Sequence, residues 1–345
     1  MSNLPKHRTA ACSNRFFRTA PVANGFAVGI WRPVAFTLCV AGAVLTSASL
    51  ALNDVRASGA GPQRPSAGPT AEIAIDTPSP APTAVPTPTP APGQPHLDQL
   101  AQSIGRIAAR APGHVSVSLI ELDGPAPQPW SYGGAIPIAA ASTYKLPALM
   151  VDVGLVARGA AANTDRLCYQ AGDWEDGWFS DYQIGDCFSR AELVNRAGHY
   201  SDNTAAHILV RDLGGAAALN AFATASGATS SSFFFKNTTT ADDLARLWAV
   251  EARGQAGGGA AQNWLYPLLT RTAYEQGIPA GVPASATVIH KTGELDPVVN
   301  DAALVTGSAN GAYVLTVMTD GAGGDAGWAL ISTISAAVWQ YESGR

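Results

Sequence analysis

The chain has 345 residues and a formal net charge of −5. Residues 57–345 hold 15 basic and 25 acidic residues, which gives this part of the chain a formal charge of −10. A surface this acidic is poorly suited to neutralising phosphates, so we expect no nucleic-acid partner.

The N-terminal residues 1–33 are basic, and an apolar run follows them. Residues 34–52 carry no charge and, as a helix, would come close to spanning a bilayer. The basic flank before this run orients the N-terminus toward the cytoplasm. We therefore expect a single-pass signal-anchor helix over 34–52, with the rest of the chain outside the cytoplasm at the cell membrane. The alternative is a long signal peptide whose cleavage releases a secreted protein.

Residues 53–97 are rich in Pro, Thr and Ala. Of the 24 prolines, 11 lie between Pro62 and Pro95. This composition cannot build a core and favours polyproline II, at about 3.1 Å per residue. Such a segment could hold a domain on the order of 100 Å from the bilayer. We interpret residues 53–97 as a disordered linker and residues 98–345 as the one folded domain.

Two strands and a helix are predicted at the start of this domain. Residues 114–124 alternate in polarity and end in Asp-Gly, which indicates a strand and a turn. A second strand is predicted from Trp130 to Ile138. Residues 142–158 are mostly apolar at helical length, and they predict a buried helix entered from a serine.

Helices, three strands and a last helix follow. Capping boxes at Ser189 and Thr240 predict two helices, and another is predicted over 203–213, ending at Gly214. Strand-like runs occupy 285–293, 300–308 and 312–321, and residues 328–342 predict a final helix. This order indicates a mixed α/β fold of the α+β kind, with one sheet assembled from both ends of the chain.

Cys168 and Cys187 lie in the part expected outside the cytoplasm, where a disulfide is chemically permitted. Closing a loop of this length could stabilise the fold by about 3 kcal/mol. Because sequence cannot show whether the two Cα atoms approach, a bridge and two free thiols both remain open.

Three short motifs carry the candidate chemistry. The chain has four lysines, and two of them lie in these motifs, which read Ser142-Thr143-Tyr144-Lys145, Ser201-Asp202-Asn203 and Lys291-Thr292-Gly293. Ser142 begins a predicted helix, where backbone N–H groups stabilise negative charge. Lys145 follows one turn later on the same face, so its amine can reach the Ser142 hydroxyl. Among other cations and apolar groups, its pKa can be lowered enough for it to act as a base.

The other motif residues suit substrate binding and proton relay. Ser201 can pass a proton, and Asn203 can hold either the substrate amide or Lys145. Lys291 can stabilise charge on Ser201 and on a substrate carboxylate, which Thr292 can also bind. Past Gly293, the N–H of Glu294 can complete an oxyanion hole with the N–H of Ser142.

In this order, the motifs resemble the S-x-x-K, S-D-N and K-T-G signatures of the class A β-lactamase and penicillin-binding protein superfamily. The likeness extends over about residues 98–345, through AASTYKLPALM, HYSDNTAAHILVRDLGG and NTTTADDLARL. It implies a five-stranded type of antiparallel sheet flanked by helices, a helical lobe, and a site between them. It also implies a monomeric serine hydrolase, acylated on Ser142 by β-lactams or D-Ala-D-Ala-like peptides of peptidoglycan, without a cofactor.

Two departures from the family affect function. Class A enzymes carry a Glu on an Ω-loop between the S-D-N and Thr-Thr segments, where it activates the water that releases the acyl group. Here residues 213–241 contain no Asp or Glu, and the loop is shorter than in the family. Family members also often bind the substrate carboxylate with an Arg after K-T-G, but no Arg occurs between Lys291 and Arg345. We expect β-lactams to acylate the protein and to be released slowly.

Several alternatives stay open. Turnover could come from Lys145, as in D,D-peptidases, or from an acidic loop that contains Asp173, Glu175, Asp176, Asp181 and Asp186. The aromatic residues of this loop, Trp174, Trp178 and Tyr182, could form a substrate wall, or the loop could be merely solvated. The chain could also be a non-hydrolytic penicillin-binding or cell-wall-binding module. No G-x-S-x-G, H-E-x-x-H or paired C-x-x-C occurs, and the acidic loop has poor ligand spacing for Ca²⁺, so no metal site is predicted.

Overall fold

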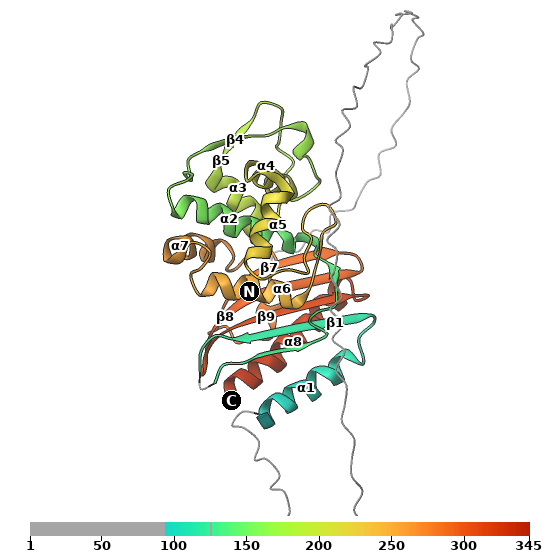
Figure 1. Ribbon diagram of the computed structural model, residues 1–345. Helices are drawn as coiled ribbons and strands as arrows, with labels where there is room; N and C mark the ends of the chain where they lie inside the picture. Colours follow the sequence, from blue (N-terminus) through green and yellow to red (C-terminus); the bar gives the residue numbers. More distant parts are fainter. Residues whose placement is uncertain (1–93, 125) are drawn as a thin grey trace, which may run out of the picture. The chain divides into compact units, whose positions relative to one another are not determined.

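The computed structural model describes residues 94–345, except residue 125 (Figure 1). Its centre is a five-stranded antiparallel sheet in the order β2-β1-β9-β8-β7. The strands are β1 (His114–Glu121), β2 (Pro129–Tyr132), β7 (Thr287–Leu295), β8 (Val298–Ser308) and β9 (Gly311–Asp320). Strands from the two ends of the described chain lie side by side, which confirms the predicted sheet.

The predicted second strand is wrong in its extent. β2 ends at Tyr132, because a turn closed by Ile136 N–H on the Gly133 carbonyl follows it. Ile138 lies instead in β3 (Ile138–Ala139), which pairs with β6 (Thr238–Thr239) in a separate ribbon. Gly133 has φ 60°, a conformation that glycine adopts without steric cost, so the chain turns there.

The two faces of the sheet bury different cores. Because side chains alternate along a strand, Val299 and Ala303 of β8 face one cluster, and Ala302 and Leu304 face the other. The first cluster is covered by α1 (Gln94–Ala108) and α8 (Gly324–Gly344), which pack against each other. α1 was not predicted, and it begins four residues before the expected start of the domain at 98. On the opposite face lies α6 (Ala241–Ala252), whose Trp248 indole donates to the Ala302 carbonyl at 2.9 Å.

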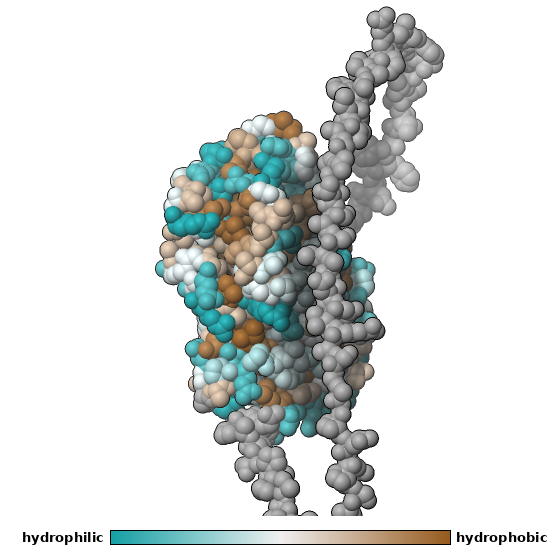
Figure 2. Space-filling model, in the orientation of Figure 1, coloured by the Kyte–Doolittle hydropathy of each residue, from teal (hydrophilic) through white to brown (hydrophobic). Residues whose placement is uncertain are grey.

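The remaining helices form a lobe around α2 (Lys145–Ala157). α2 contacts α3 (Arg190–His199), α4 (Asn203–Asp212), α5 (Gly215–Ala225) and α7 (Gly258–Leu268). Short 3₁₀ turns lie at η1 (Ala141–Tyr144), η2 (Ala171–Asp173) and η3 (Ile278–Gly281). α5 takes 11 residues of the stretch in which an Ω-loop was expected. Its outward residues are largely alanine, and Figure 2 shows apolar surface on the part of the lobe where α5 lies.

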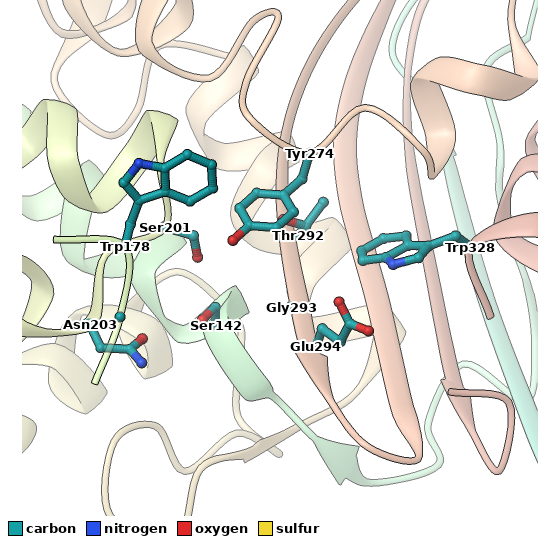
Figure 3. Close-up of a pocket in the computed structure, with 10 residues that line it drawn as sticks. Ser142, Trp178, Ser201, Asn203, Tyr274, Thr292, Gly293, Glu294 and Trp328 are labelled. Carbon is teal, nitrogen blue, oxygen red and sulfur yellow. The ribbon is translucent and has the colours of Figure 1, made fainter. Parts of the chain in front are cut away.

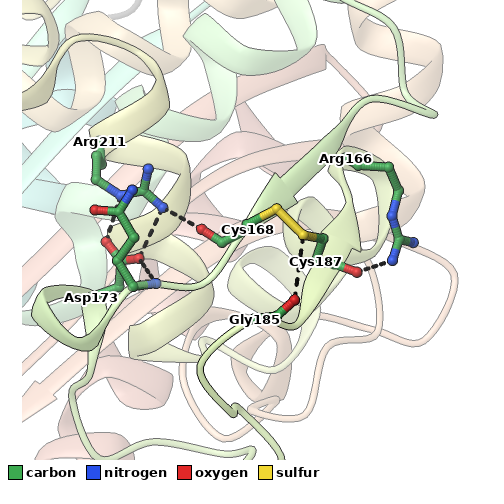
Figure 4. Close-up of a disulfide and its surroundings, with 7 residues drawn as sticks. Arg166, Cys168, Asp173, Gly185, Cys187 and Arg211 are labelled. Atoms are coloured by element: carbon green, nitrogen blue, oxygen red, sulfur yellow. Dashed lines mark hydrogen bonds and ion pairs between the residues drawn. A yellow bond between two sulfur atoms is a disulfide. The ribbon is translucent and has the colours of Figure 1, made fainter.

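A disulfide joins Cys168 and Cys187 in the helical lobe (Figure 4). The two residues face each other in the ribbon of β4 (Arg166–Cys168) and β5 (Cys187–Ser189). Arg211 of α4 donates to the Cys168 carbonyl at 2.8 Å and to Asp173 at 2.7 Å. The bridge and these bonds hold the two ends of the acidic loop together.

Among the described residues, no helix is both long and apolar enough to cross a membrane. The predicted signal-anchor helix, residues 34–52, lies outside the described part of the chain.

Candidate active site

Ser142 lies in η1, a 3₁₀ turn that leads directly into α2. Ala141 before it has φ 47°, an uncommon conformation for a residue with a side chain. Neighbouring segments hold this turn. The Asn237 amide donates to the Ala141 carbonyl at 3.0 Å, and the Asn300 amide donates to the Ala139 carbonyl at 2.8 Å. The turn is therefore fixed by the segment before α6 and by the sheet together.

Gly293 lets β7 lie directly against the Ser142 turn. A Cβ atom at Gly293 would lie 2.8 Å from the Ala140 oxygen, closer than Cβ atoms approach in proteins, and 3.0 Å from the Ser142 nitrogen, which is also a tight contact. Glycine is therefore required there for packing. The close contact brings Glu294 and Ser142 to the same cavity, which is the arrangement that the predicted oxyanion pair needs.

Lys145 is fully buried beneath the nucleophile. Its Nζ lies 3.0 Å from Ser142 Oγ, 2.5 Å from the Ser201 carbonyl oxygen and 2.6 Å from Asn203 Oδ1. The carbonyl and the amide oxygen only accept hydrogen bonds. A neutral amine therefore donates its two hydrogens to them, and its lone pair is left facing the Ser142 hydroxyl. This is the geometry of a general base.

Burial and charge both favour the neutral form of Lys145. Burial lowers its pKa well below the usual value, and the nearby Lys291 ammonium lowers it further, against smaller opposing effects of Asp202 and Glu175. Burial also lowers the pKa of Lys291 to about 7. Two positive charges in one buried site repel each other, so protonating both Lys145 and Lys291 is unfavourable. The neutral Lys145 amine can therefore take the Ser142 proton.

Ser201 connects the two lysines. Its Oγ accepts from Lys291 Nζ at 2.8 Å and lies 3.4 Å from Lys145 Nζ. Asp202 fixes the turn because its carboxylate accepts from Ala205 N–H at 2.8 Å and from the Tyr182 hydroxyl at 2.6 Å. The three motifs therefore meet at one point, although they come from different elements.

The acidic loop supports this site without supplying a carboxylate to it. Asp173 pairs with Arg211, Asp181 with Arg196, and Glu175 with His207 at 2.9 Å. The Asp176 carbonyl accepts from the Asn203 amide at 2.6 Å, and the Asp186 side chain accepts from Gln183 N–H within the loop. No acidic side chain of this loop lines the cavity.

The cavity beside Ser142 has a volume of about 300 Å³ (Figure 3). It is lined by Ser142, Gly177, Trp178, Ser201, Asn203, Tyr274, Thr292, Gly293, Glu294 and Trp328. Of the three aromatic residues considered as a substrate wall, only Trp178 lines it, whereas Tyr182 is buried against Asp202. Tyr274 and Trp328 were missed, because single aromatic residues in a loop and in a helix carry no pattern that points to a cleft. Among the described residues, no group of three or more His, Cys, Asp or Glu side chains could hold a metal ion.

His290 lies directly before Lys291 in β7 and is buried between two carboxylates. Its Nδ1 lies 2.9 Å from Asp301, and its Nε2 lies 3.0 Å from Glu275. Both ring nitrogens can donate only in the charged imidazolium. Burial alone would lower the pKa of His290, but Asp301 and Glu275 outweigh it and raise the pKa to about 9. This ion network links β7 to the loop that carries Tyr274.

We expect the His290→Asn substitution to destabilise the protein most strongly at pH 6. A raised pKa means that the stabilisation is complete below about pH 6.5 and is lost as the pH rises through about 9. The difference in unfolding free energy between wild type and variant should therefore shrink by on the order of 3 kcal/mol between pH 6 and pH 10. Lys145 and Lys291 act in the opposite sense over this range, so the difference between the proteins is the quantity to measure.

Denaturant unfolding followed by fluorescence at each pH measures this difference. His199→Asn is the matched control, since His199 has no carboxylate partner among the ion pairs of the described chain. A difference that stays constant from pH 6 to pH 10 would show that His290 is not charged in the folded protein.

Comparison with known proteins places this site in a family. A model of the β-lactamase enzyme family matches residues 99–342. Curated protein sequences give no match. The structure of PBP-A superposes with a TM-score of 0.66 and 28% identity, covering 71% of this chain and 96% of that one.

Two β-lactamase structures are also similar. An ancestral class A β-lactamase has 25% identity and a TM-score of 0.64, with 70% of this chain and 99% of that one covered. A β-lactamase from Sphaerobacter thermophilus has 26% identity and a TM-score of 0.64, with 71% and 97% covered. The antiparallel sheet, the helical lobe and the three converging motifs are those of a serine hydrolase, and the chain belongs to the β-lactamase enzyme family.

Proposed function

We propose that the protein forms an acyl-enzyme on Ser142 with β-lactams or D-Ala-D-Ala-like peptides, and that it releases the acyl group slowly. One observation carries the first part of this proposal. The Ser142 hydroxyl lies 3.0 Å from a buried amine whose other two near partners are oxygens that only accept hydrogen bonds. The activated oxygen opens into a cavity large enough for a small amide.

The contacts support one order of proton transfers. Lys145 takes the proton of Ser142 while Ser142 Oγ bonds to the carbonyl carbon, and the N–H groups of Ser142 and Glu294 stabilise the resulting oxyanion. Ser201 then gives its proton to the leaving nitrogen, and its oxygen regains one from the lysine pair. The C–N bond breaks, and the acyl group remains on Ser142.

Slow release follows from the surroundings of the ester. Residues 213–241 contain no acidic side chain, and Glu294 is the one carboxylate among the cavity residues. General-base assistance typically accelerates a step by about 10²–10⁴-fold, so the lack of a carboxylate base dedicated to deacylation supports slow release. A PBP-A variant has been captured as an acyl-enzyme complex with penicillin G.

A fluorescent penicillin followed by an unlabelled chase tests the proposal. We expect covalent labelling within minutes, and loss of the label over a time that is long compared with its formation. Loss as fast as formation would contradict slow deacylation and would identify an efficient β-lactamase. Absence of any label would contradict the acyl-enzyme itself.

The missing acidic side chain also favours a second candidate, a penicillin-binding sensor or cell-wall-binding module without turnover. The same chase separates the two candidates, because a sensor keeps its label for hours and releases no product. The intact chain of contacts from Ser142 through Lys145 to Ser201 supports an acylated protein over a cell-wall-binding module that binds without a covalent bond, since such a module has no need of an activated nucleophile.

We also propose that the domain is tethered outside the cell membrane. Support comes from the uncharged residues 34–52, the basic segment before them and the Pro-rich linker after them. After cells are labelled with the fluorescent penicillin and lysed, the labelled chain should sediment with the membranes. Its recovery from the culture medium would overturn the tether and favour the secreted form.

A further inference from the structure

An ion pair between the acidic loop and α4 lies close to Lys145 but outside the cavity. It is made by Glu175, whose carboxylate lies 2.9 Å from His207 Nε2. Neither side chain lines the cavity beside Ser142. Any part that the pair plays in the reaction is therefore indirect and passes through the residues that it adjoins.

The first turn of α4 joins this pair to Lys145. Asn203 begins the helix, and its Oδ1 lies 2.6 Å from Lys145 Nζ. His207 follows four residues later, which puts it on the same face of the helix as Asn203. The buried Thr204 hydroxyl accepts from the Glu175 N–H at 3.1 Å and donates to the Glu175 carbonyl at 2.8 Å. The turn that holds the lysine amine therefore also fixes both members of the pair.

Aromatic rings connect the pair to the turn that carries the nucleophile. The centre of the Phe234 ring lies 4.9 Å from that of His207 and 5.8 Å from that of Tyr144. The Tyr144 ring lies in turn 5.7 Å from Lys145 Nζ. Charges interact more strongly through such surroundings than through water. Because the Glu175 side chain is 52% exposed, water still screens part of its charge.

The charges that act on Lys145 come from several elements. Burial lowers the pKa of Lys145, and Lys291 of β7 lowers it further. Asp202, directly before α4, and Glu175 act in the opposite sense. The Asp202 carboxylate is fully buried and accepts three hydrogen bonds that hold its own turn. Glu175 is thus a second carboxylate near the amine, and its charge also adds to the effect of burial in raising the pKa of Tyr144.

His207 keeps the Glu175 carboxylate in place without cancelling its charge. Burial lowers the pKa of His207, and Lys145 lowers it further, whereas Glu175 and Asp173 oppose this shift. The imidazole is therefore neutral at pH 7. With its hydrogen on Nε2, it donates one hydrogen bond to Glu175 and leaves the carboxylate negative.

We propose that the Glu175 carboxylate, held by His207, stabilises the positive charge that Lys145 gains during acylation. Glu175 is then a positioning residue, because it acts through Lys145 and does not touch the substrate. This inference rests on the proposed acyl transfer to Ser142, in which the hydroxyl proton moves to Lys145 Nζ while the oxygen bonds to the acyl carbon. The neutral amine becomes an ammonium, so a nearby carboxylate stabilises the transition state more than the starting state.

The Glu175→Gln substitution tests the proposal on the full chain. The measured quantity is the second-order rate constant for labelling by a fluorescent penicillin, from about pH 4 to about pH 9. Glutamine keeps the size of the side chain and can still accept a hydrogen bond from His207, but it carries no charge. Without the carboxylate, the pKa of Lys145 falls further, so the rise of the rate constant with pH should move to lower pH by about 0.5–1 unit.

The pH dependence separates this effect from a loss of structure. A less basic Lys145 takes the proton less readily, so the plateau of the rate constant at high pH should fall by about twofold to threefold. At the acidic end of the range, more of the Lys145 amine is neutral in the variant than in wild type. The variant should therefore be labelled faster than wild type there, by about twofold to threefold. A substitution that merely loosened the acidic loop would slow labelling by one factor at every pH.

Two further variants complete the experiment. Asp98→Asn removes the same charge from exposed α1, outside the cavity, and should keep the wild-type pH profile. His207→Leu removes the donor that holds the carboxylate, so Glu175→Gln should move the profile less in this background than in wild type. A full shift in the His207→Leu background would overturn the part assigned to His207.

Two failures are distinguishable. If wild type is not labelled, or is labelled no faster than Ser142→Ala, the acyl-enzyme proposal fails, and this inference fails with it. If wild type is labelled through Ser142 but the rate of Glu175→Gln relative to wild type stays constant with pH, or falls toward acidic pH, only the role of Glu175 is overturned.

Discussion

The Ser142→Ala substitution is expected to abolish covalent labelling by penicillin. The Ser142 hydroxyl lines the cavity and lies 3.0 Å from the Lys145 amine. The other serine of the cavity, Ser201, has its oxygen 3.4 Å from that amine and bound to Lys291, so we do not expect it to replace Ser142 as the nucleophile. The measurement is the time course of fluorescent labelling followed by mass spectrometry of the intact chain. The added mass of the antibiotic should appear on wild type and be missing from the variant.

The fold should survive this change, because it removes one oxygen from a half-buried side chain. Thermal unfolding of Ser142→Ala should therefore stay close to that of wild type. The matched control is Ser131→Ala, at an exposed position of β2, which should label like wild type. Equal labelling of Ser142→Ala and wild type would rule out Ser142 as the acylated residue.

The Lys145→Met substitution is expected to slow acylation by about 10²–10⁴-fold. Methionine keeps most of the volume of the side chain and removes the amine that accepts the Ser142 proton. The second-order rate constant for penicillin labelling measures this loss. In wild type, this rate constant should rise with pH through the lowered pKa of Lys145 and then level off, whereas the variant should lack that step.

A structural effect of this change is separable from the chemical one. Removing the amine leaves the Ser201 carbonyl and the Asn203 side chain without a donor, which costs stability. Lys145→Arg restores a cation but not a base, so it should not restore the rate. The control is Lys236→Met, at an exposed lysine outside the cavity. Acylation of Lys145→Met at the wild-type rate would contradict the assignment of Lys145 as the base.

The sequence predicted most of the sheet and the reacting groups, because both leave local signals. Alternating polarity marks β1, strand-like apolar runs mark the three C-terminal strands, and three short motifs mark Ser142, Lys145, Ser201 and Lys291. The structure shows that these residues share one network, which spacing alone could not show.

Other parts had no local signal. The Ala-rich α5 was not predicted although alanine favours helices, because no capping side chain marks its start and the family resemblance placed a loop in this stretch. Tyr274 and Trp328 enter the cavity through the path of the chain around β7 and α8 rather than through any motif. The carboxylates of the acidic loop could equally have faced the nucleophile. The arginines on α3 and α4 that bind Asp181 and Asp173 decide otherwise, and their pairing is a tertiary contact.

Gly293 lies directly against the 3₁₀ turn that carries Ser142, and this contact has a consequence for folding: the site is complete only after β7 has docked. The turn and α2 are made early in the chain, whereas β7 arrives after the whole helical lobe has been synthesised. Contacts between such distant segments form late and slowly. Until β7 docks, neither Lys291 nor the N–H of Glu294 lies at the site, so the Ser142 hydroxyl lacks the second lysine and half of the proposed oxyanion hole. We therefore expect a partly folded chain to be unreactive, so that covalent capture of a penicillin, if the proposed acylation holds, would report that the N-terminal and C-terminal strands of the sheet have come together.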